Sequence, residues 1–201
     1  MTGGVPTLRS HILARIREGV SVQASLESIA DQVAQVADIM VRTLQRGNKL
    51  VFFGNGGSAA DAQHLAAELV GKFYVRGRRA LPAIALTVNT SVLTAIANDF
   101  SYDDVFARQV EALGREGDMA VGLTTSGNSE NVVRGIDKAR SLGMITIGMT
   151  DASGGLLKTR VDRCLCIPSD STPRIQEAHI LLGHILCEIV EGELARDQGL
   201  P

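Results

Sequence analysis

The sequence predicts an α/β fold in which helices cover both faces of a parallel β-sheet, a three-layer αβα sandwich. Five short apolar runs recur along the chain, and helical segments separate each run from the next. Each run is continuously apolar rather than alternating, as expected for strands that are buried on both faces. Because strands alternate with helices, successive strands should lie parallel and be joined by right-handed crossovers. A chain of 201 residues can bury a sizeable core, so we expect one domain over residues 1–201.

Helical structure is expected first, over residues 7–46. Apolar side chains recur there at spacings of three and four and form one stripe: Leu26, Ile29, Val33, Val36, Met40 and Leu44. The helix should end at Gly47. The stripe suits packing against the domain and contact between subunits equally well. Because it exceeds what one small sheet face needs, we also predict a helical core between subunits.

The remaining elements are placed by their apolar runs and by the turns between them. Strands are expected at residues 49–54, 82–86, 119–124, 144–150 and 163–167. Helices are expected at residues 58–71, 90–98, 103–114, 129–142 and 155–160. A long terminal helix should begin at Pro173. Ligands of such sheets bind beyond the carboxyl ends of the strands, so the polar loops at those ends are the candidate sites.

The loop at residues 124–129, TTSGNS, gathers hydroxyl groups at the start of a helix. Free N–H groups and the helix dipole favour an anion at such a position. The hydroxyl side chains are those of Thr124, Thr125, Ser126 and Ser129. A helix cap at Ser129 would need only one hydroxyl, so the pattern favours a phosphate monoester. The loop is neither a P-loop nor a dinucleotide fingerprint.

Two further polar segments follow other elements. In GNGGS, at residues 54–58, glycines let the backbone approach a ligand closely. Asn55 and Ser58 can hydrogen-bond sugar hydroxyls, although a tight strand-to-helix turn explains this segment equally well. In ANDF, Asn98 and Asp99 follow a helix, where Asn98 could simply be a C-cap.

Two helices carry side chains that could supply chemistry. His64 and Glu68 are four residues apart and therefore share a helix face. That spacing suits two zinc ligands or an acid–base pair, but it is also common on surface helices. The terminal helix adds Gln176 and His184, with His179 as a competitor, and a histidine on such a helix is more often a core residue.

Composition excludes several classes of protein. The formal net charge of −2 argues against a nucleic-acid binder, and the basic segment VRGRR at residues 75–79 is expected to be a solvated loop. No apolar run reaches the roughly 18 residues of a membrane span, and the N-terminus lacks the apolar core of a signal peptide. Three cysteines without a CxxC pair suggest reduced thiols, so we expect a cytoplasmic protein.

Taken together, the segments GNGGSAADAQH…E, ANDF, TSGNS and RIQEAH…GH resemble the sugar isomerase (SIS) domain family, and within it the bacterial phosphoheptose isomerases. The resemblance covers nearly the whole chain. It implies a flavodoxin-like or Rossmann-like five-stranded parallel sheet between helices. It also implies N-terminal helices over residues 1–48, an α/β core over residues 49–201, and assembly as a homotetramer.

The resemblance also implies an activity. Members interconvert sedoheptulose 7-phosphate and D-glycero-D-manno-heptose 7-phosphate through an enediol, the first committed step toward the heptose of lipopolysaccharide and other bacterial surface glycans. Several members hold zinc, so we expect one Zn²⁺ per subunit. Its implied ligands are His64, Glu68, Gln176 and His184. We expect Glu68 to be the catalytic base and His184 the acid.

The implied substrate contacts divide between sugar and phosphate. The predicted sugar contacts are Asn55, Gly56, Gly57, Ser58, Glu68, Asn98, Asp99 and Gln176. The predicted phosphate contacts are Thr124, Thr125, Ser126 and Ser129. Pro173 departs from the pattern, because some members carry an acid there.

Three other readings remain. Some relatives are adaptors that bind the replication initiator and have lost the catalytic groups, whereas Glu68 and His184 are present here. SIS-containing regulators sense sugar phosphates, but they add a DNA-binding domain for which residues 1–48 are short and neutral. Lyases acting on N-acetylmuramic acid 6-phosphate are usually longer chains.

Overall fold

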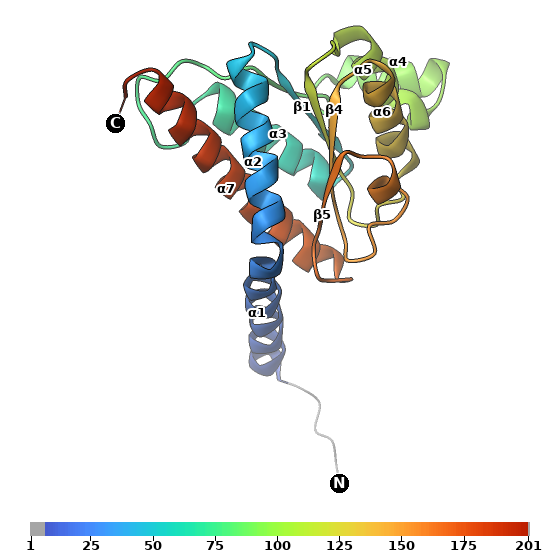
Figure 1. Cartoon of the computed structure of the whole chain (residues 1–201). Coiled ribbons are helices and arrows are strands. Elements are labelled where there is room, and N and C mark those ends of the chain that lie inside the picture. The colour runs from blue at the N-terminus through green and yellow to red at the C-terminus, as the bar shows by residue number, and fades with distance from the viewer. Residues whose placement is uncertain (1–6, 201) are drawn as a thin grey trace.

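A computed structural model describes residues 7–200 (Figure 1). The N-terminal elements are the helices α1 (Leu8–Ser25), η1 (Leu26–Ile29) and α2 (Ala30–Gln45). Next come β1 (Leu50–Gly54), α3 (Gly57–Val70), β2 (Ala83–Ala85), α4 (Thr90–Asp99), η2 (Tyr102–Asp104) and α5 (Val105–Leu113). The chain continues with β3 (Met119–Leu123), α6 (Glu130–Ser141), β4 (Ile145–Thr150), η3 (Leu157–Thr159), β5 (Arg163–Cys166) and α7 (Thr172–Asp197). Residues 1–6 and 201 of the predicted domain lie outside the described part.

The five strands form one parallel sheet in the order β2-β1-β3-β4-β5, which confirms the predicted class. The central strands β1 and β3 are buried along their whole length. The edge strands β2 and β5 are only partly buried, so burial of every strand on both faces was a wrong expectation. An edge strand has one neighbour, and its outer side is open to solvent.

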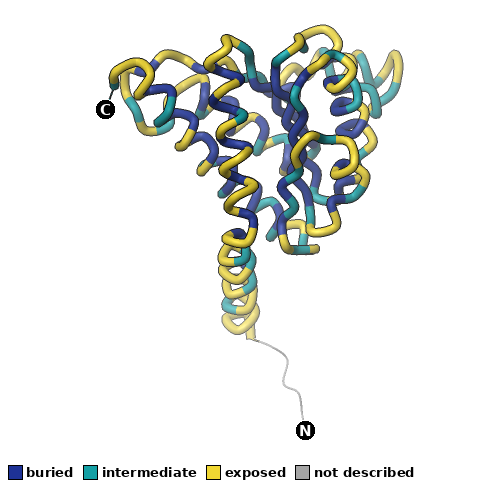
Figure 2. The backbone as a smooth tube through the Cα atoms, viewed as in Figure 1, coloured by how far each residue is buried: buried dark blue, intermediate teal, exposed yellow. Residues whose placement is uncertain are grey.

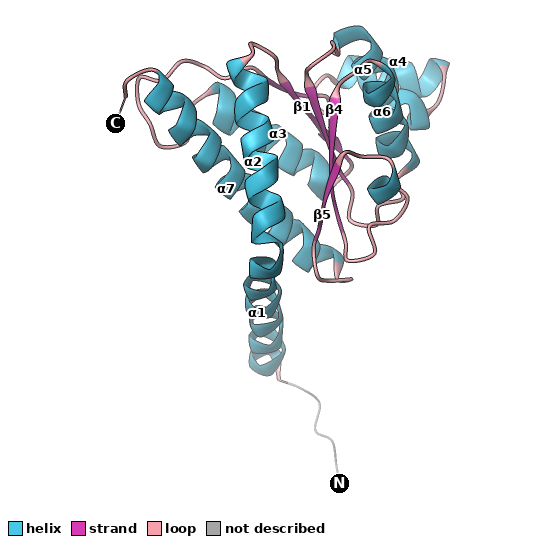
Figure 3. Cartoon of the chain, in the orientation of Figure 1, coloured by secondary structure: helices cyan, strands magenta, loops and turns pink. Residues whose placement is uncertain are grey.

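Helices cover both faces of the sheet (Figure 3). Neighbouring residues of β1 point to opposite faces, so Phe52 packs with α2, α3 and α7, while Phe53 packs with α5 and α6. These contacts make two apolar cores, one on each side of the buried strands (Figure 2). The predicted three-layer arrangement is therefore confirmed.

The N-terminal region is helical, as expected over residues 7–46. A 3-10 turn at Leu26–Ile29 separates α1 from α2. Every residue of the Leu26–Leu44 stripe is at most 8% exposed and belongs to the chain's own core, which confirms that it packs against the domain. In contrast, α1 projects from the body of the molecule (Figure 1) and exposes other apolar side chains.

Three local expectations are corrected. The helix expected at residues 155–160 is a single 3-10 turn, Leu157–Thr159. Asp99 is the last residue of α4, so Asn98 lies inside the helix and is not its C-cap. The segment VRGRR is not simply a solvated loop, because Arg78 is only 8% exposed. Across residues 7–200, no helix combines the length and the apolar character needed to cross a membrane.

Candidate active site

Two predicted loops lie side by side at the carboxyl edge of the sheet. The last residues of β1 and β3, Gly54 and Leu123, are paired in register, so the loops that follow them are neighbours. The amides of Asn55 and Asn131 exchange two hydrogen bonds of 2.8 and 2.9 Å across this junction. The Tyr102 hydroxyl donates a third to Asn55 at 3.1 Å. Asn55 is therefore held by α6, which starts at the second loop.

The first loop brings α7 to the start of α3. Gly56 is the N-cap of α3 with φ +56°, a conformation that favours glycine. A Cβ on Gly57 would collide with the side-chain amide of Gln176, so this amide lies directly against the loop. Ser58 is buried, while Asn55 is half-buried. The structure thus brings Gln176 together with the loop predicted to bind the sugar.

The second loop presents its hydroxyl groups around the start of α6. Ser129 occupies the N-cap position, but its side chain makes no cap hydrogen bond. Its Oγ instead lies 2.8 Å from Oγ1 of Thr124, which is buried. Ser126 is exposed, and Gly127 has φ +66° where its backbone meets that of Gly154. Ordinary capping does not explain these hydroxyls, and the arrangement favours an anion at the helix start.

Three titratable residues from α3 and α7 converge at the second half of α3. Nε2 of His64 lies 2.8 Å from Nε2 of His184 and 3.2 Å from Oε1 of Glu68. The two imidazole rings meet edge-on with centroids 5.0 Å apart, and the ring of Phe73 lies 5.7 Å from that of His184. A base and an acid are therefore available within one small cluster.

Two groups outside the predicted set bear on the site: Asp61 acts on His64, and Asn131 holds Asn55. Asp61 lies three residues before His64, and its buried Oδ2 has no hydrogen-bond partner in the described part of the chain. Burial raises the pKa of this carboxyl to about 6, although His64 acts in the opposite direction. Asp61 can therefore hold a proton close to neutral pH. Asn131 was also missed; the i, i+3 spacing to His64 could have indicated Asp61, but no local pattern indicates Asn131.

Other predicted residues lie apart from the cluster. Asn98 and Asp99 are exposed at the end of α4, where the Asn98 amide donates to Asp99 at 2.8 Å. Within residues 7–200, no hydrogen bond joins them to other predicted site residues. His179 is fully buried in α7, and neither ring nitrogen has a hydrogen-bond partner among residues 7–200. His179 is therefore a core histidine, the alternative that was weighed against a role for His184.

The predicted zinc ligands are only partly brought together. His64, Glu68 and His184 are in contact, whereas the Gln176 amide lies against Gly57 at the start of α3. Two imidazoles and a carboxylate are donors that zinc accepts. Among the described residues, however, no group of three or more His, Cys, Asp or Glu side chains is placed to hold a metal. Zn–N distances of about 2.05 Å in a tetrahedral site put two nitrogens about 3.3 Å apart. His64 and His184, at 2.8 Å, would have to separate slightly to admit the ion.

Comparison with known proteins adds independent findings. Residues 17–151 match the family model described as SIS domain. The chain is 53% identical to phosphoheptose isomerase of Roseiflexus sp. (strain RS-1), covering 91% of this chain and 93% of the relative. It is 55% identical to phosphoheptose isomerase of Aquifex aeolicus (strain VF5), covering 87% and 92%. The structure of phosphoheptose isomerase from Neisseria gonorrhoeae is similar, with a TM-score of 0.87, 41% identity, and coverage of 92% and 100%.

Proposed function

Because the chain belongs to the phosphoheptose isomerases, a family of SIS domain proteins, we propose that it converts sedoheptulose 7-phosphate to D-glycero-D-manno-heptose 7-phosphate. It is an aldose–ketose isomerase of heptose biosynthesis. The single observation that carries the chemistry is the meeting of Glu68 and His184 around His64, between α3 and α7. A proton-transfer group and a phosphate-binding loop are what this reaction requires.

The phosphate group of the substrate binds at the start of α6. Ser126 and Ser129 donate hydrogen bonds to it, and Thr124 supports Ser129 through their 2.8 Å contact. Thr125 adds a fourth hydroxyl. The sugar extends from there toward the first loop, where Asn55, Gly56, Gly57 and Ser58 lie beside the Gln176 amide. This placement carries C1 and C2 to the cluster between α3 and α7.

The isomerisation moves one proton between neighbouring carbons. Glu68, as the carboxylate, takes the proton from C1 of the ketose, which leaves an enediol. The same carboxyl group returns a proton to C2, and the carbonyl is then at C1. His184 moves the matching proton between the oxygens on C2 and C1, so the substrate gains and loses no atoms overall. His64, in contact with both groups, holds them in place.

We also propose a zinc ion, held by His64, Glu68, Gln176 and His184. When bound, zinc would polarise the substrate carbonyl and stabilise negative charge on its oxygen. A histidine whose ring nitrogen binds zinc cannot donate a proton from that nitrogen. The assignment of His184 as acid and its assignment as ligand therefore describe different states of the site, and metal analysis of the purified protein decides between them.

A homotetramer is proposed from the apolar surface of the N-terminal half. The exposed apolar residues of α1 are Leu8, Ile12, Ile16 and Val20. They lead toward an apolar groove of about 320 Å³ between the N-terminal helices and α7. Sedimentation of the chain at micromolar concentration should give a tetramer. Ile12→Asp with Ile16→Asp should dissociate it, while Ala14→Asp on the opposite face of α1 should not; a wild-type monomer would contradict the assembly. The cytoplasmic location stays a prediction.

The adaptor and sensor readings are weaker. Glu68 and His184 are present and meet in space, which a protein that only binds another protein does not need. Incubation with sedoheptulose 7-phosphate, followed by NMR, tests the enzyme directly. An aldoheptose 7-phosphate should accumulate. No product in the presence or absence of added zinc would contradict the proposed function.

A further inference from the structure

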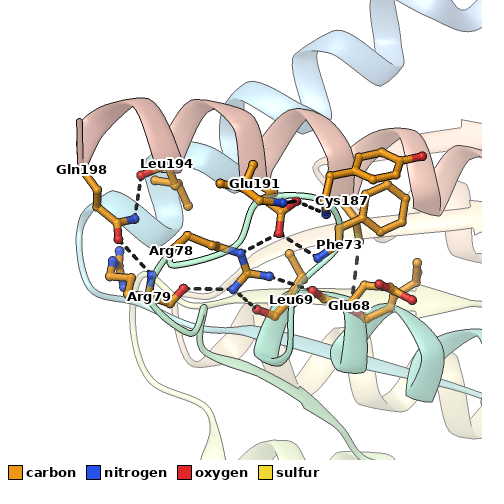
Figure 4. A network of polar contacts seen from close by, with 12 residues as sticks. Glu68, Leu69, Phe73, Arg78, Arg79, Cys187, Glu191, Leu194 and Gln198 are labelled. Atoms are coloured by element: carbon orange, nitrogen blue, oxygen red, sulfur yellow. Dashed lines mark hydrogen bonds and ion pairs between the residues drawn. The ribbon is translucent and has the colours of Figure 1, made fainter. Parts of the chain in front are cut away.

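A buried ion pair joins α7 to the segment that follows α3 (Figure 4). Nε of Arg78 donates to Oε1 of Glu191 at 2.7 Å, and their side chains are 1% and 2% exposed. Glu191 is seven residues after His184 on α7, so the two share a helix face two turns apart. The pair therefore lies on the side of α7 that also carries the predicted acid.

The other N–H groups of Arg78 donate hydrogen bonds to the carboxyl end of α3. Nη2 donates to the Glu68 carbonyl at 2.8 Å, and Nη1 donates to the Leu69 carbonyl at 2.8 Å. The last carbonyls of a helix lack intrahelical partners, and a cation is favourable there. The guanidinium therefore fixes the backbone of the residue that we assign as the catalytic base.

Glu191 binds the backbone of residues 73–75, the segment that follows α3. Its carboxylate accepts hydrogen bonds from the backbone N–H groups of Phe73 at 2.8 Å and Val75 at 2.9 Å, and from that of Tyr74. Burial raises the pKa of Glu191, but these N–H groups and Arg78 outweigh it and bring the pKa to about 2. The carboxylate is therefore charged at neutral pH. Phe73, held in this way, places its ring against His184.

A stabilising role alone explains this arrangement poorly. Replacing a buried ion pair by apolar residues is often neutral or stabilising, because both charges lose their hydration. Here each charged group also bears on one predicted catalytic residue. Arg78 binds the backbone of Glu68, and Glu191 orients Phe73, whose ring lies against His184. The pair thus connects the two helices that carry the site.

We propose that Arg78 and Glu191 are positioning residues, which set the distance between Glu68 and His184 during isomerisation. The proposal rests on the proposed function, since it concerns the same site. Neither residue touches the substrate. A misplacement of about 1 Å at a reacting centre can cost on the order of 100-fold in rate, so the effect should be large.

The test uses Arg78→Lys and Glu191→Gln with a matched control. Arg78→Lys keeps the charge but not the fork of donors, and Glu191→Gln keeps the shape but not the charge. The control is Asp118→Asn. Asp118 is also buried, pairs with Lys49, and accepts hydrogen bonds from the backbone N–H groups of Lys49 and Arg115. It lies directly before β3, whereas Arg78 and Glu191 join the end of α3 to α7.

Both pair variants should lower kcat by about 10- to 100-fold while KM changes less than about threefold, because the phosphate loop is not touched. Asp118→Asn should lower the melting temperature but leave kcat unchanged. If Arg78→Lys does not fold, Glu191→Gln decides the matter. A kcat that falls equally in the control, or stays at the wild-type value in both pair variants, would overturn the proposal.

A second measurement separates this proposal from the proposed function. The ring resonances of His64 and His184, assigned by NMR without substrate, should shift in Arg78→Lys and Glu191→Gln and should not shift in Asp118→Asn. If the wild type does not turn over sedoheptulose 7-phosphate, the proposed function fails while the ring resonances still decide the positioning role. Unshifted rings in both pair variants would overturn that role.

Discussion

Nε2 of His64 and Nε2 of His184 lie 2.8 Å apart, although 120 positions separate the two residues in the sequence. Their neighbours explain how the two helices come so close. Gly183 packs against Leu65, and a Cβ on Gly183 would lie only 2.5 Å from Cδ2 of Leu65. The glycine at this crossing removes the side chain that would keep α3 and α7 apart.

Gly183→Ala should therefore damage the site as well as the fold. The added methyl group overpacks the crossing, at a cost of about 1–3 kcal/mol in the free energy of unfolding, and separates the two histidines. The free energy of unfolding, measured by denaturant titration, and kcat should both decrease. Gly192→Ala is the matched control on the same helix, since its nearest neighbouring atom would be 3.9 Å away. It should raise stability by about 0.5–1 kcal/mol. A Gly183→Ala variant with wild-type kcat would contradict this account of the crossing.

Much of the fold could be predicted from the sequence because the buried strands are apolar runs without interruption. Strands such as β1 and β3 are buried on both faces, so their residues are apolar without interruption, and that local pattern is readable. The boundary between α1 and α2 was not readable, because Leu26 and Ile29 of the 3-10 turn keep the helical spacing of the apolar stripe in α2.

The site was predicted only in part, because sequence spacing reports local contacts and not contacts between residues far apart in the chain. The spacing of His64 and Glu68 is local, but their convergence with His184 was expected from resemblance rather than from the residues themselves. The burial of Arg78 depends on Glu191, which is 113 positions away, so a basic run alone indicated a solvated loop. Asn131 was missed because its partner Asn55 is 76 positions away.

Ser126→Ala with Ser129→Ala should weaken substrate binding without unfolding the protein. Each lost hydrogen bond to a charged phosphate should cost about 1.5–3 kcal/mol in binding free energy. Ser129 makes no cap hydrogen bond, but its loss removes the 2.8 Å contact with the buried Thr124 hydroxyl, so the melting temperature should fall modestly. Calorimetric titration measures the affinity. Ser141→Ala, at the far end of α6, is the control that should bind normally. Unchanged affinity in the double variant would place the phosphate elsewhere.

Zinc should be present at about one ion per chain in protein purified without chelator. Chelation should lower the activity or the melting temperature, because the proposed ion would join α3 to α7. His64→Gln should reduce the metal content, whereas His11→Gln on the exposed part of α1 should not. Elemental analysis measures the content. Metal-free protein whose activity and stability do not respond to chelation would leave the cluster as an acid–base site alone.

His179 should make stability depend on pH. Burial lowers its pKa to about 4, below the value of about 6.5 in the unfolded chain. The unfolded state therefore binds the proton more readily. The contribution of His179 is complete above about pH 6.5 and is lost as the pH falls toward 4, by about 3 kcal/mol.

The His179→Leu variant should lack this decrease. Asp61, whose pKa is raised, contributes with the opposite sign over an overlapping range, so the quantity to compare is the difference between variant and wild type. Denaturant unfolding at several pH values from 7 to 4 measures it. Parallel curves for the two proteins would show that His179 does not titrate as described.

The proton transfer by Glu68 is the central claim, and exchange in deuterated water tests it most directly. Wild-type protein given sedoheptulose 7-phosphate should place deuterium on C2 of the aldose, because the carboxyl exchanges its proton with solvent. Glu68→Gln keeps the shape of the side chain but removes the base, so turnover and exchange should fall by about 10²–10⁴-fold. Metal content and substrate affinity of the variant must be measured alongside. If the variant retains both and loses turnover and exchange, the assignment stands; if it turns over at a rate close to wild type, Glu68 is not the base.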